Sequence, residues 1–215
     1  MKYIFVAGAP GSKWSSTVKN IYYSPSIDRS DYTVERTYWH DAPGHLELMH
    51  LGAYWDPGME FGGDFLELDQ MTKEECESEF DRPFTENNNG IRIIKSHVFC
   101  HHLEFISKTW EDCPIVIVRR SNDACLGWWV KCGHFNITYP LYHDYYHNLR
   151  EMATHITNQN GDLERWRIGN PTIPVNNNRE LSRALGIEIP PEEYIQYYST
   201  SDVKVEVNLP KYRRK

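Results

Sequence analysis

The chain has 215 residues, of which 40% are hydrophobic and 25% are charged, and its formal net charge is −7 at pH 7. This length suits one domain with a proper core, so we expect a single domain over residues 1–215. The acidic balance disfavours a general nucleic-acid-binding protein. There is no membrane-length apolar run, no signal-peptide pattern and no CxxC pair among the five cysteines, which favours a cytoplasmic protein.

Apolar, largely β-branched runs predict strands over residues 3–8, 91–95 and 114–118, and a weaker alternating run predicts a fourth over 203–207. The first three runs are almost continuously apolar, as expected of parallel strands that are buried on both faces. Helices are predicted over 15–23, from a capping box at Thr72, and over 101–110, 121–129, 140–157 and 179–185.

Alternating strands and helices predict the α/β class, with a mainly parallel central sheet flanked by helices. Residues 24–70 are rich in aromatic and acidic side chains and show no clear period, so we expect a substrate-loop region there. The side chains expected to shape its pocket are Tyr38, Trp39, His40, His45, His50, Tyr54 and Trp55, and a role in the core is the alternative for most of its aromatic residues. Residues 208–215 are expected to form a basic tail.

The first predicted strand runs directly into a loop rich in glycine and serine at the start of a helix. The loop reads Gly8-Ala9-Pro10-Gly11-Ser12-Lys13-Trp14-Ser15-Ser16. Backbone N–H groups at a helix N-terminus, together with hydroxyls and a lysine, are typical of phosphate binding. The loop is one residue shorter than a Walker A motif, and no hydroxyl directly follows Lys13. A glycine-rich turn without a ligand is the alternative.

The second predicted strand ends in Lys95-Ser96-His97. Residues two apart on a strand point to the same side, so Lys95 and His97 are expected to share a face. Ligands of open α/β sheets bind beyond the carboxyl ends of the strands, where this pair offers a cation and a base. The alternatives are a surface histidine without a catalytic role and a zinc site made by His97, Cys100, His101 and His102.

The third predicted strand leads to Arg119 and Arg120 at the start of another helix. A guanidinium is well suited to a bidentate grip on phosphate. An ion pair between Arg119 and Asp123 that holds the loop together is the structural alternative, and both interpretations are compatible.

In their order and approximate spacing, these three segments resemble the sulfotransferase family that uses 3′-phosphoadenosine-5′-phosphosulfate (PAPS). The family motifs P-K-S-G-T-T-W, K-T-H and R-N-P-x-D-x-x-x-S-Y are similar to residues 10–16, 95–97 and 119–128. Gly11, Ser16 and Gly127 stand where the family has lysine, tryptophan and serine, and the late R-K-G-x-x-G-D-W segment is absent. The resemblance covers roughly residues 1–135.

The resemblance implies a P-loop-like three-layer architecture and sulfuryl transfer from PAPS to a hydroxyl or amine of a small-molecule or glycan acceptor. It implies no metal, and we expect no nucleic-acid or membrane partner. His97 is then the general base, while Lys95 and Lys13 stabilise the transferred group. The implied cofactor-binding residues are Pro10, Gly11, Ser12, Lys13, Trp14, Ser15 and Ser16, with Arg119 and Gly127 at the 3′-phosphate.

Two other functions compete with this one. A P-loop nucleotide or small-molecule kinase is suggested by the start of the loop, although of the parts it requires only the displaced Lys13 is present. A non-catalytic nucleotide-binding module is the second, and the pair Lys95 and His97 argues against it because such a module has no physical need of them.

Overall fold

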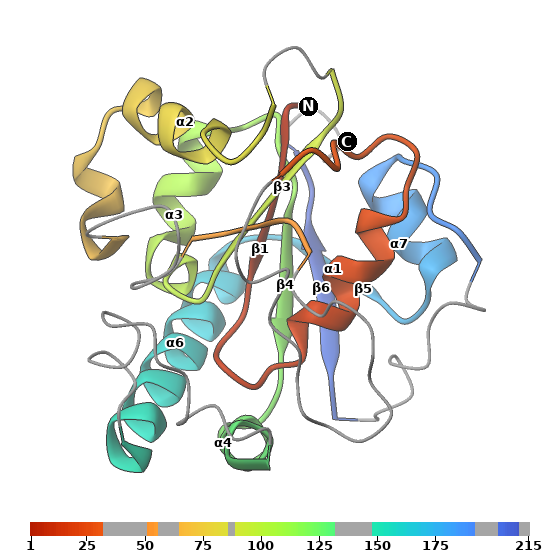
Figure 1. The fold of residues 1–215 in the computed structure, drawn as a ribbon. Coiled ribbons are helices and arrows are strands. Elements are labelled where there is room, and N and C mark those ends of the chain that lie inside the picture. The colour runs from red at the N-terminus through yellow and green to blue at the C-terminus, as the bar shows by residue number, and fades with distance from the viewer. Residues whose placement is uncertain (32–50, 56–64, 86–88, 132–147, 192–201, 211–215) are drawn as a thin grey trace.

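The computed structural model describes residues 1–31, 51–55, 65–85, 89–131, 148–191 and 202–210. At its centre lies a six-stranded sheet with the order β2-β3-β1-β4-β6-β5 (Figure 1). The strands are β1 Tyr3–Ala7, β2 Ala53–Tyr54, β3 Arg92–Ser96, β4 Ile115–Arg119, β5 Thr172–Val175 and β6 Lys204–Asn208. The helices are α1 Trp14–Tyr22, the 3-10 helix η2 Phe65–Gln70, α2 Lys73–Asp81, α3 Phe99–Thr109, α4 Asn122–Lys131, α6 Leu149–Gly169 and α7 Asn178–Leu185.

Helices cover both faces of the sheet, with α2 and α3 on one side and α1 and α7 on the other (Figure 1). Every residue of β1 is buried. Ile4 and Val6 belong to the hydrophobic cluster that includes α1 and α7, whereas Phe5 and Ala7 belong to the cluster that includes α2 and α3. This burial on two faces explains the continuous apolar run of the sequence, and it confirms the predicted α/β class with helices flanking a central sheet.

The sheet is mixed but mostly parallel. β1 pairs in parallel with β3 and β4, and β2 pairs in parallel with β3. β6 runs antiparallel between β4 and β5. The short β2 and the proline-containing β5 were not predicted, and they form the two edges of the sheet. Proline is tolerated in an edge strand because it lacks an N–H group, and an edge strand pairs with a neighbour on one side only.

Local signals identified two helix ends correctly. At the start of α2, Thr72 Oγ1 accepts a hydrogen bond from the Glu75 N–H, and the Glu75 carboxylate accepts one from the Thr72 N–H, which completes the predicted capping box. α7 ends at Gly186, whose φ of 69° is the left-handed conformation that glycine adopts most easily. For α6 the predicted end at Thr157 was wrong, because the helix continues to Gly169.

The strands β1, β3 and β4 are parallel, so their carboxyl ends lie together on the same side of the molecule. The three predicted motifs follow these strand ends directly. Of the predicted substrate-loop region, residues 32–50 and 56–64 lie outside the described residues, as do residues 140–147 and the tail from 211. None of the described helices combines the length and the apolar character needed to cross a membrane.

Candidate functional site

The loop after β1 has the strand–loop–helix geometry that phosphate binding requires. Gly11 has a φ of 78° and Lys13 a φ of 67°, so the chain turns sharply before α1 begins at Trp14. The turn packs tightly against α4, because a Cβ on Gly11 would lie 2.1 Å from the backbone oxygen of Cys125. Glycine is therefore required at position 11 both by its conformation and by the space around it.

Inside the turn, the hydroxyl of Ser12 points back toward the start of the loop. Its oxygen lies 2.8 Å from the position that a Cβ on Gly8 would occupy. Ser12 is fully buried, and among the described residues its Oγ has no hydrogen-bond partner. Leaving a buried hydroxyl without a hydrogen bond costs about 1–3 kcal/mol of folding free energy. A bound anion that accepts a hydrogen bond from Ser12 would offset this cost.

His97 lies directly beside this loop. Its Nδ1 is 2.5 Å from the carbonyl oxygen of Gly8, which can only accept, so Nδ1 carries the hydrogen and Nε2 the lone pair. The indole of Trp14 stacks on the imidazole with ring centroids 3.9 Å apart and planes inclined by 14°. The His97 ring is therefore fixed in both orientation and tautomer.

Burial lowers the pKa of His97 to about 3, the Gly8 hydrogen bond opposes this change, and the charge of Lys95 adds to it. The imidazole is thus neutral at pH 7, in the form that can accept a proton. A pKa this low makes it a weak base in the absence of a nearby anion.

Lys95 and His97 share a face of β3, as their spacing predicted. Tyr54 of β2 contacts both: its ring centroid is 5.3 Å from Lys95 Nζ and 5.7 Å from the His97 ring centroid. Lys95 is fully buried in this aromatic surrounding. Tyr54, from the predicted pocket region, therefore joins Trp14, Lys95 and His97 in one cluster beside the loop.

Arg119 turns away from the loop. Its guanidinium forms ion pairs with Glu164 of α6 at 2.9 Å and with Glu206 of β6 at 2.7 Å. The alternative ion pair with Asp123 is not formed, because the guanidinium binds Glu164 and Glu206 instead. That Arg119 binds a 3′-phosphate remains a prediction.

Arg120 is the arginine that reaches the loop, although only its neighbour Arg119 was predicted to bind the 3′-phosphate. Its Nη1 donates to the carbonyl oxygens of Gly11 at 3.3 Å and of Ala124 at 3.0 Å. Its Nε donates to Asp202 at 2.6 Å. Side chains alternate along β4, so when Arg119 faces α6 the next residue faces the loop, and this alternation was the signal available in the sequence.

Lys13 lies over α4, where its Nζ is 4.4 Å from the ring centroid of Trp128. Gly127 lies next to this ring, and no heavy atom is within 4 Å of the position that its Cβ would take. Ser15 and Ser16 are half-buried in the first turn of α1. In the described contacts, Lys13 thus lies against Trp128 of α4, whereas Lys95 and His97 both lie against the ring of Tyr54.

The residues of the alternative zinc site point in different directions. His97 bonds to Gly8, whereas His101 Nδ1 lies 2.5 Å from Asp162 of α6 and His102 Nδ1 lies 3.6 Å from Asp69. Within the described ranges, no three His, Cys, Asp or Glu side chains are grouped so that they could hold a metal ion. His97, His101 and His102 therefore do not form a zinc site together.

The ion pairs of Arg119 lead to a stability prediction. Replacing Arg119 with methionine should lower the free energy of unfolding by about 2 kcal/mol, because the largely buried Glu206 loses its nearest cation. Urea denaturation measures this loss, and adding Glu206→Gln should recover part of it. Lys108→Ala, which breaks the exposed pair with Glu104, is the control and should change stability by less than about 0.5 kcal/mol. Equal effects of the two single substitutions would contradict the structural role of Arg119.

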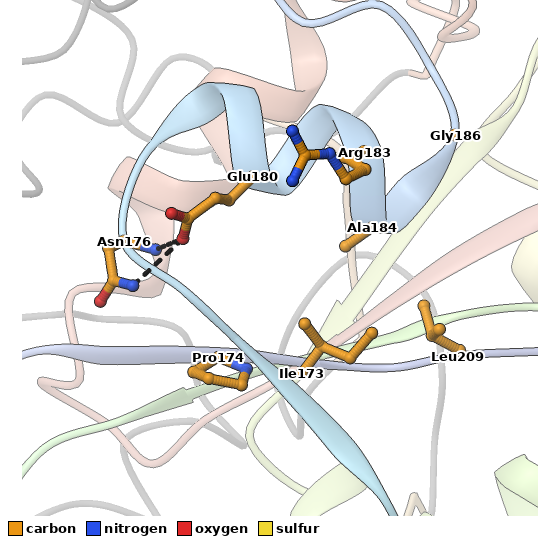
Figure 2. A pocket seen from close by; sticks show the side chains of 8 residues that line it. All are labelled: Ile173, Pro174, Asn176, Glu180, Arg183, Ala184, Gly186 and Leu209. Atoms are coloured by element: carbon orange, nitrogen blue, oxygen red, sulfur yellow. Dashed lines mark hydrogen bonds between the residues drawn. The ribbon is translucent and has the colours of Figure 1, made fainter. Parts of the chain in front are cut away.

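A cavity of about 660 Å³ lies elsewhere, between β5 and α7, and shares no residue with the loop (Figure 2). It is lined by Ile173, Pro174, Asn176, Glu180, Arg183, Ala184, Gly186 and Leu209. At its rim the Glu180 carboxylate accepts hydrogen bonds from the backbone N–H and the side-chain amide of Asn176, at 2.8 and 3.1 Å. This cavity was not predicted from the sequence, because one of its walls is β5, which was not predicted either.

Comparison of the chain with protein-family models, with curated proteins and with solved structures finds no match. The function is therefore proposed from the geometry of the loop and of the residues beside it.

Proposed function

We propose that the protein transfers the sulfuryl group of PAPS to a hydroxyl or amine of a small-molecule or glycan acceptor. The observation that supports this proposal best is the contact between His97 and Gly8, at 2.5 Å. It joins two motifs that lie 89 residues apart in the chain. A phosphate-type loop with a base and a buried cation beside it is the arrangement that sulfuryl transfer needs, because such a transfer depends mainly on positioning and charge stabilisation.

The loop residues fit the 5′-phosphosulfate end of the donor. The buried Ser12 hydroxyl lacks a partner among the described residues, and the first turn of α1 contains no acidic residue to offset the preference of a helix N-terminus for anions. Ser15 and Ser16 add hydroxyls in the same turn. These donors would hold the anion in place without a full Walker A sequence.

His97 would act as the general base through Nε2, since Gly8 occupies Nδ1. An anionic group bound at the neighbouring loop raises the pKa of the imidazole above its value of about 3 and so makes it a better base. The proton of the acceptor moves to Nε2 as the acceptor atom bonds to sulfur and the bond from sulfur to the 5′-phosphate oxygen breaks. Lys95 would stabilise the charge on the transferred group and the leaving phosphate.

A thermal-shift comparison tests this proposal. In EDTA, adenosine 3′,5′-bisphosphate and PAPS should raise Tm, whereas ATP and AMP should have little effect. A ligand present at 100 times its Kd adds about 2.7 kcal/mol to the free energy of unfolding. A shift by ATP that requires magnesium would favour the kinase instead. The absence of any nucleotide shift would reject the proposal.

Ser12→Ala separates binding from folding within the same experiment. The ligand-free variant should be as stable as the parent protein or more stable, because a buried hydroxyl without a partner is removed. The shift caused by the bisphosphate should shrink. A variant that keeps the full shift would remove Ser12 from the binding site.

A further inference from the structure

We propose that the cavity between β5 and α7 binds a small zwitterion with an apolar body, of the class of an α-amino acid with an apolar side chain. The ligand's carboxylate would bind Arg183, its ammonium group would bind Glu180, and its apolar part would lie on β5. At about 660 Å³ the cavity is within the usual range for small-molecule sites. Because it shares no residue with the loop after β1, this site does not depend on the sulfuryl transfer proposed above.

The floor of the cavity is an apolar surface that the fold leaves open. Ile173 and Pro174 of β5 are both exposed, and Ile173 keeps 43% of its surface accessible. Leu209, which follows β6, lines the same cavity and is half-buried. Figure 2 shows these three side chains opposite the charged side chains of α7. Single exposed apolar residues are ordinary on a protein surface, but these adjoin one hollow, so one apolar ligand would remove all of them from water.

The carboxylate of Glu180 is fixed at the rim with one oxygen left over. Its Oε2 accepts both hydrogen bonds from Asn176, and its Oε1 accepts none from the described residues. The bonds from Asn176, followed by the weaker effects of Asn177 and of the charge of Arg183, lower the pKa of Glu180, so the group is ionised at pH 7. A fixed carboxylate oxygen suits an ammonium group, because a charge-assisted hydrogen bond then forms with little loss of freedom.

The guanidinium of Arg183 supplies the opposite charge on the next turn of α7. Arg183 is exposed, and within the described part of the chain it forms no hydrogen bond and no ion pair. It does not pair with Glu180 either, although residues three apart on a helix commonly do and its charge is near enough to affect the Glu180 pKa. Its planar fork of donors is therefore available to a carboxylate. Two opposite charges thus face one cavity without neutralising each other, which is the pattern complementary to a zwitterion.

Titration calorimetry at pH 7 tests the site with three probes that share one phenyl ring. L-Phenylalanine has both charges, 3-phenylpropanoate has only the carboxylate, and 2-phenylethylamine has only the ammonium group. L-Phenylalanine should bind at least about fivefold more tightly than either of the others, because it alone engages both charged side chains.

Three substitutions on α7 assign the charges. Arg183→Gln should weaken binding of L-phenylalanine and 3-phenylpropanoate about fivefold and leave 2-phenylethylamine unchanged. Glu180→Gln keeps the size of the side chain and an acceptor for Asn176, and it should weaken L-phenylalanine and 2-phenylethylamine but not 3-phenylpropanoate. Arg179→Gln is the matched control. Arg179 is also an exposed arginine of α7 but does not line the cavity, so its loss should affect no probe.

Ile173→Ser tests the apolar floor and should weaken all three probes in parallel, since they share the phenyl ring. Urea denaturation checks that each variant is folded. Equal affinities in Arg183→Gln and Arg179→Gln would overturn the inference, and so would an L-phenylalanine affinity no higher than those of the two singly charged probes. Adenosine 3′,5′-bisphosphate should bind all four variants as it binds the parent protein. If it binds none of them and L-phenylalanine binds as described, the sulfuryl transfer fails and the zwitterion site stands.

Discussion

Replacing His97 with asparagine should remove a large part of the acid sensitivity of this protein. In the folded state the pKa of His97 is lowered to about 3, against 6.5 for an unperturbed histidine. Above pH 6.5 both the folded and the unfolded chain hold this ring neutral, so its protonation does not change the free energy of unfolding there. As the pH falls below 6.5, the unfolded chain binds a proton that the folded chain does not. The free energy of unfolding therefore decreases by about 1.4 kcal/mol per pH unit until the pH reaches about 3.

The full effect amounts to about 5 kcal/mol between pH 6.5 and pH 3. Asparagine is the appropriate replacement because its side-chain N–H can still bond to the Gly8 oxygen and does not titrate in this range. Urea denaturation of the parent protein and the variant at pH 7, 5 and 4 measures the difference. Parallel stability curves over this range would show that His97 is protonated as readily in the folded chain as in the unfolded one.

The same variant addresses catalysis if an acceptor is found. Loss of the base should reduce turnover by about 10²-fold or more, while the Tm shift with adenosine 3′,5′-bisphosphate persists. Full activity would remove His97 from the proposed mechanism without affecting the stability result.

Gly11→Ala should destabilise the protein by about 4 kcal/mol, with strain at a left-handed residue and a backbone clash both contributing. The φ of Gly11 is 78°, and the added methyl group would lie 2.1 Å from the backbone oxygen of Cys125. Because that oxygen belongs to α4 and not to a flexible side chain, relief requires the loop or the helix to move. Chemical denaturation measures the loss, and loss of bisphosphate binding should accompany it.

Gly127→Ala is the control for this substitution. Gly127 lies within α4, and a Cβ there would meet no heavy atom within 4 Å. Alanine should therefore raise the free energy of unfolding by about 0.5–1 kcal/mol, the usual gain at a helix interior. If both glycine substitutions are equally tolerated, the close approach of the loop to α4 is wrong.

Much of the fold was predictable because its signals are local. The residues of β1 alternate between two buried faces, so the strand appears in the sequence as a continuous apolar run. Thr72 and Gly186 mark helix ends through hydrogen bonds and backbone conformations that depend on a few neighbouring residues. β5 was missed because Pro174 argues against a strand, and only the position of this strand at the sheet edge makes the proline acceptable.

In the candidate site, only those side-chain positions that follow from the alternation along a single strand could be predicted. The period of two residues put Lys95 and His97 on one face. In contrast, the stacking of Trp14 on His97 depends on how the first residue of α1 meets the residue that follows β3, and the orientation of Arg119 depends on the partners that α6 and β6 supply. The predicted phosphate role went to Arg119 and not to Arg120, because one residue of offset at the end of β4 decides which guanidinium meets the loop. Such contacts between distant segments have no local signature.

The position of β6 between β4 and β5 has a consequence for biosynthesis. β5 obtains its backbone partners from β6 alone in the described sheet, although β6 is made later. A nascent chain on the ribosome therefore exposes the edge of β4, with Val116 and Val118 on it, until residues 204–208 emerge and insert. An unpaired strand edge recruits other chains, so the interval before β6 pairs with β4 is the one in which this chain is most exposed to aggregation.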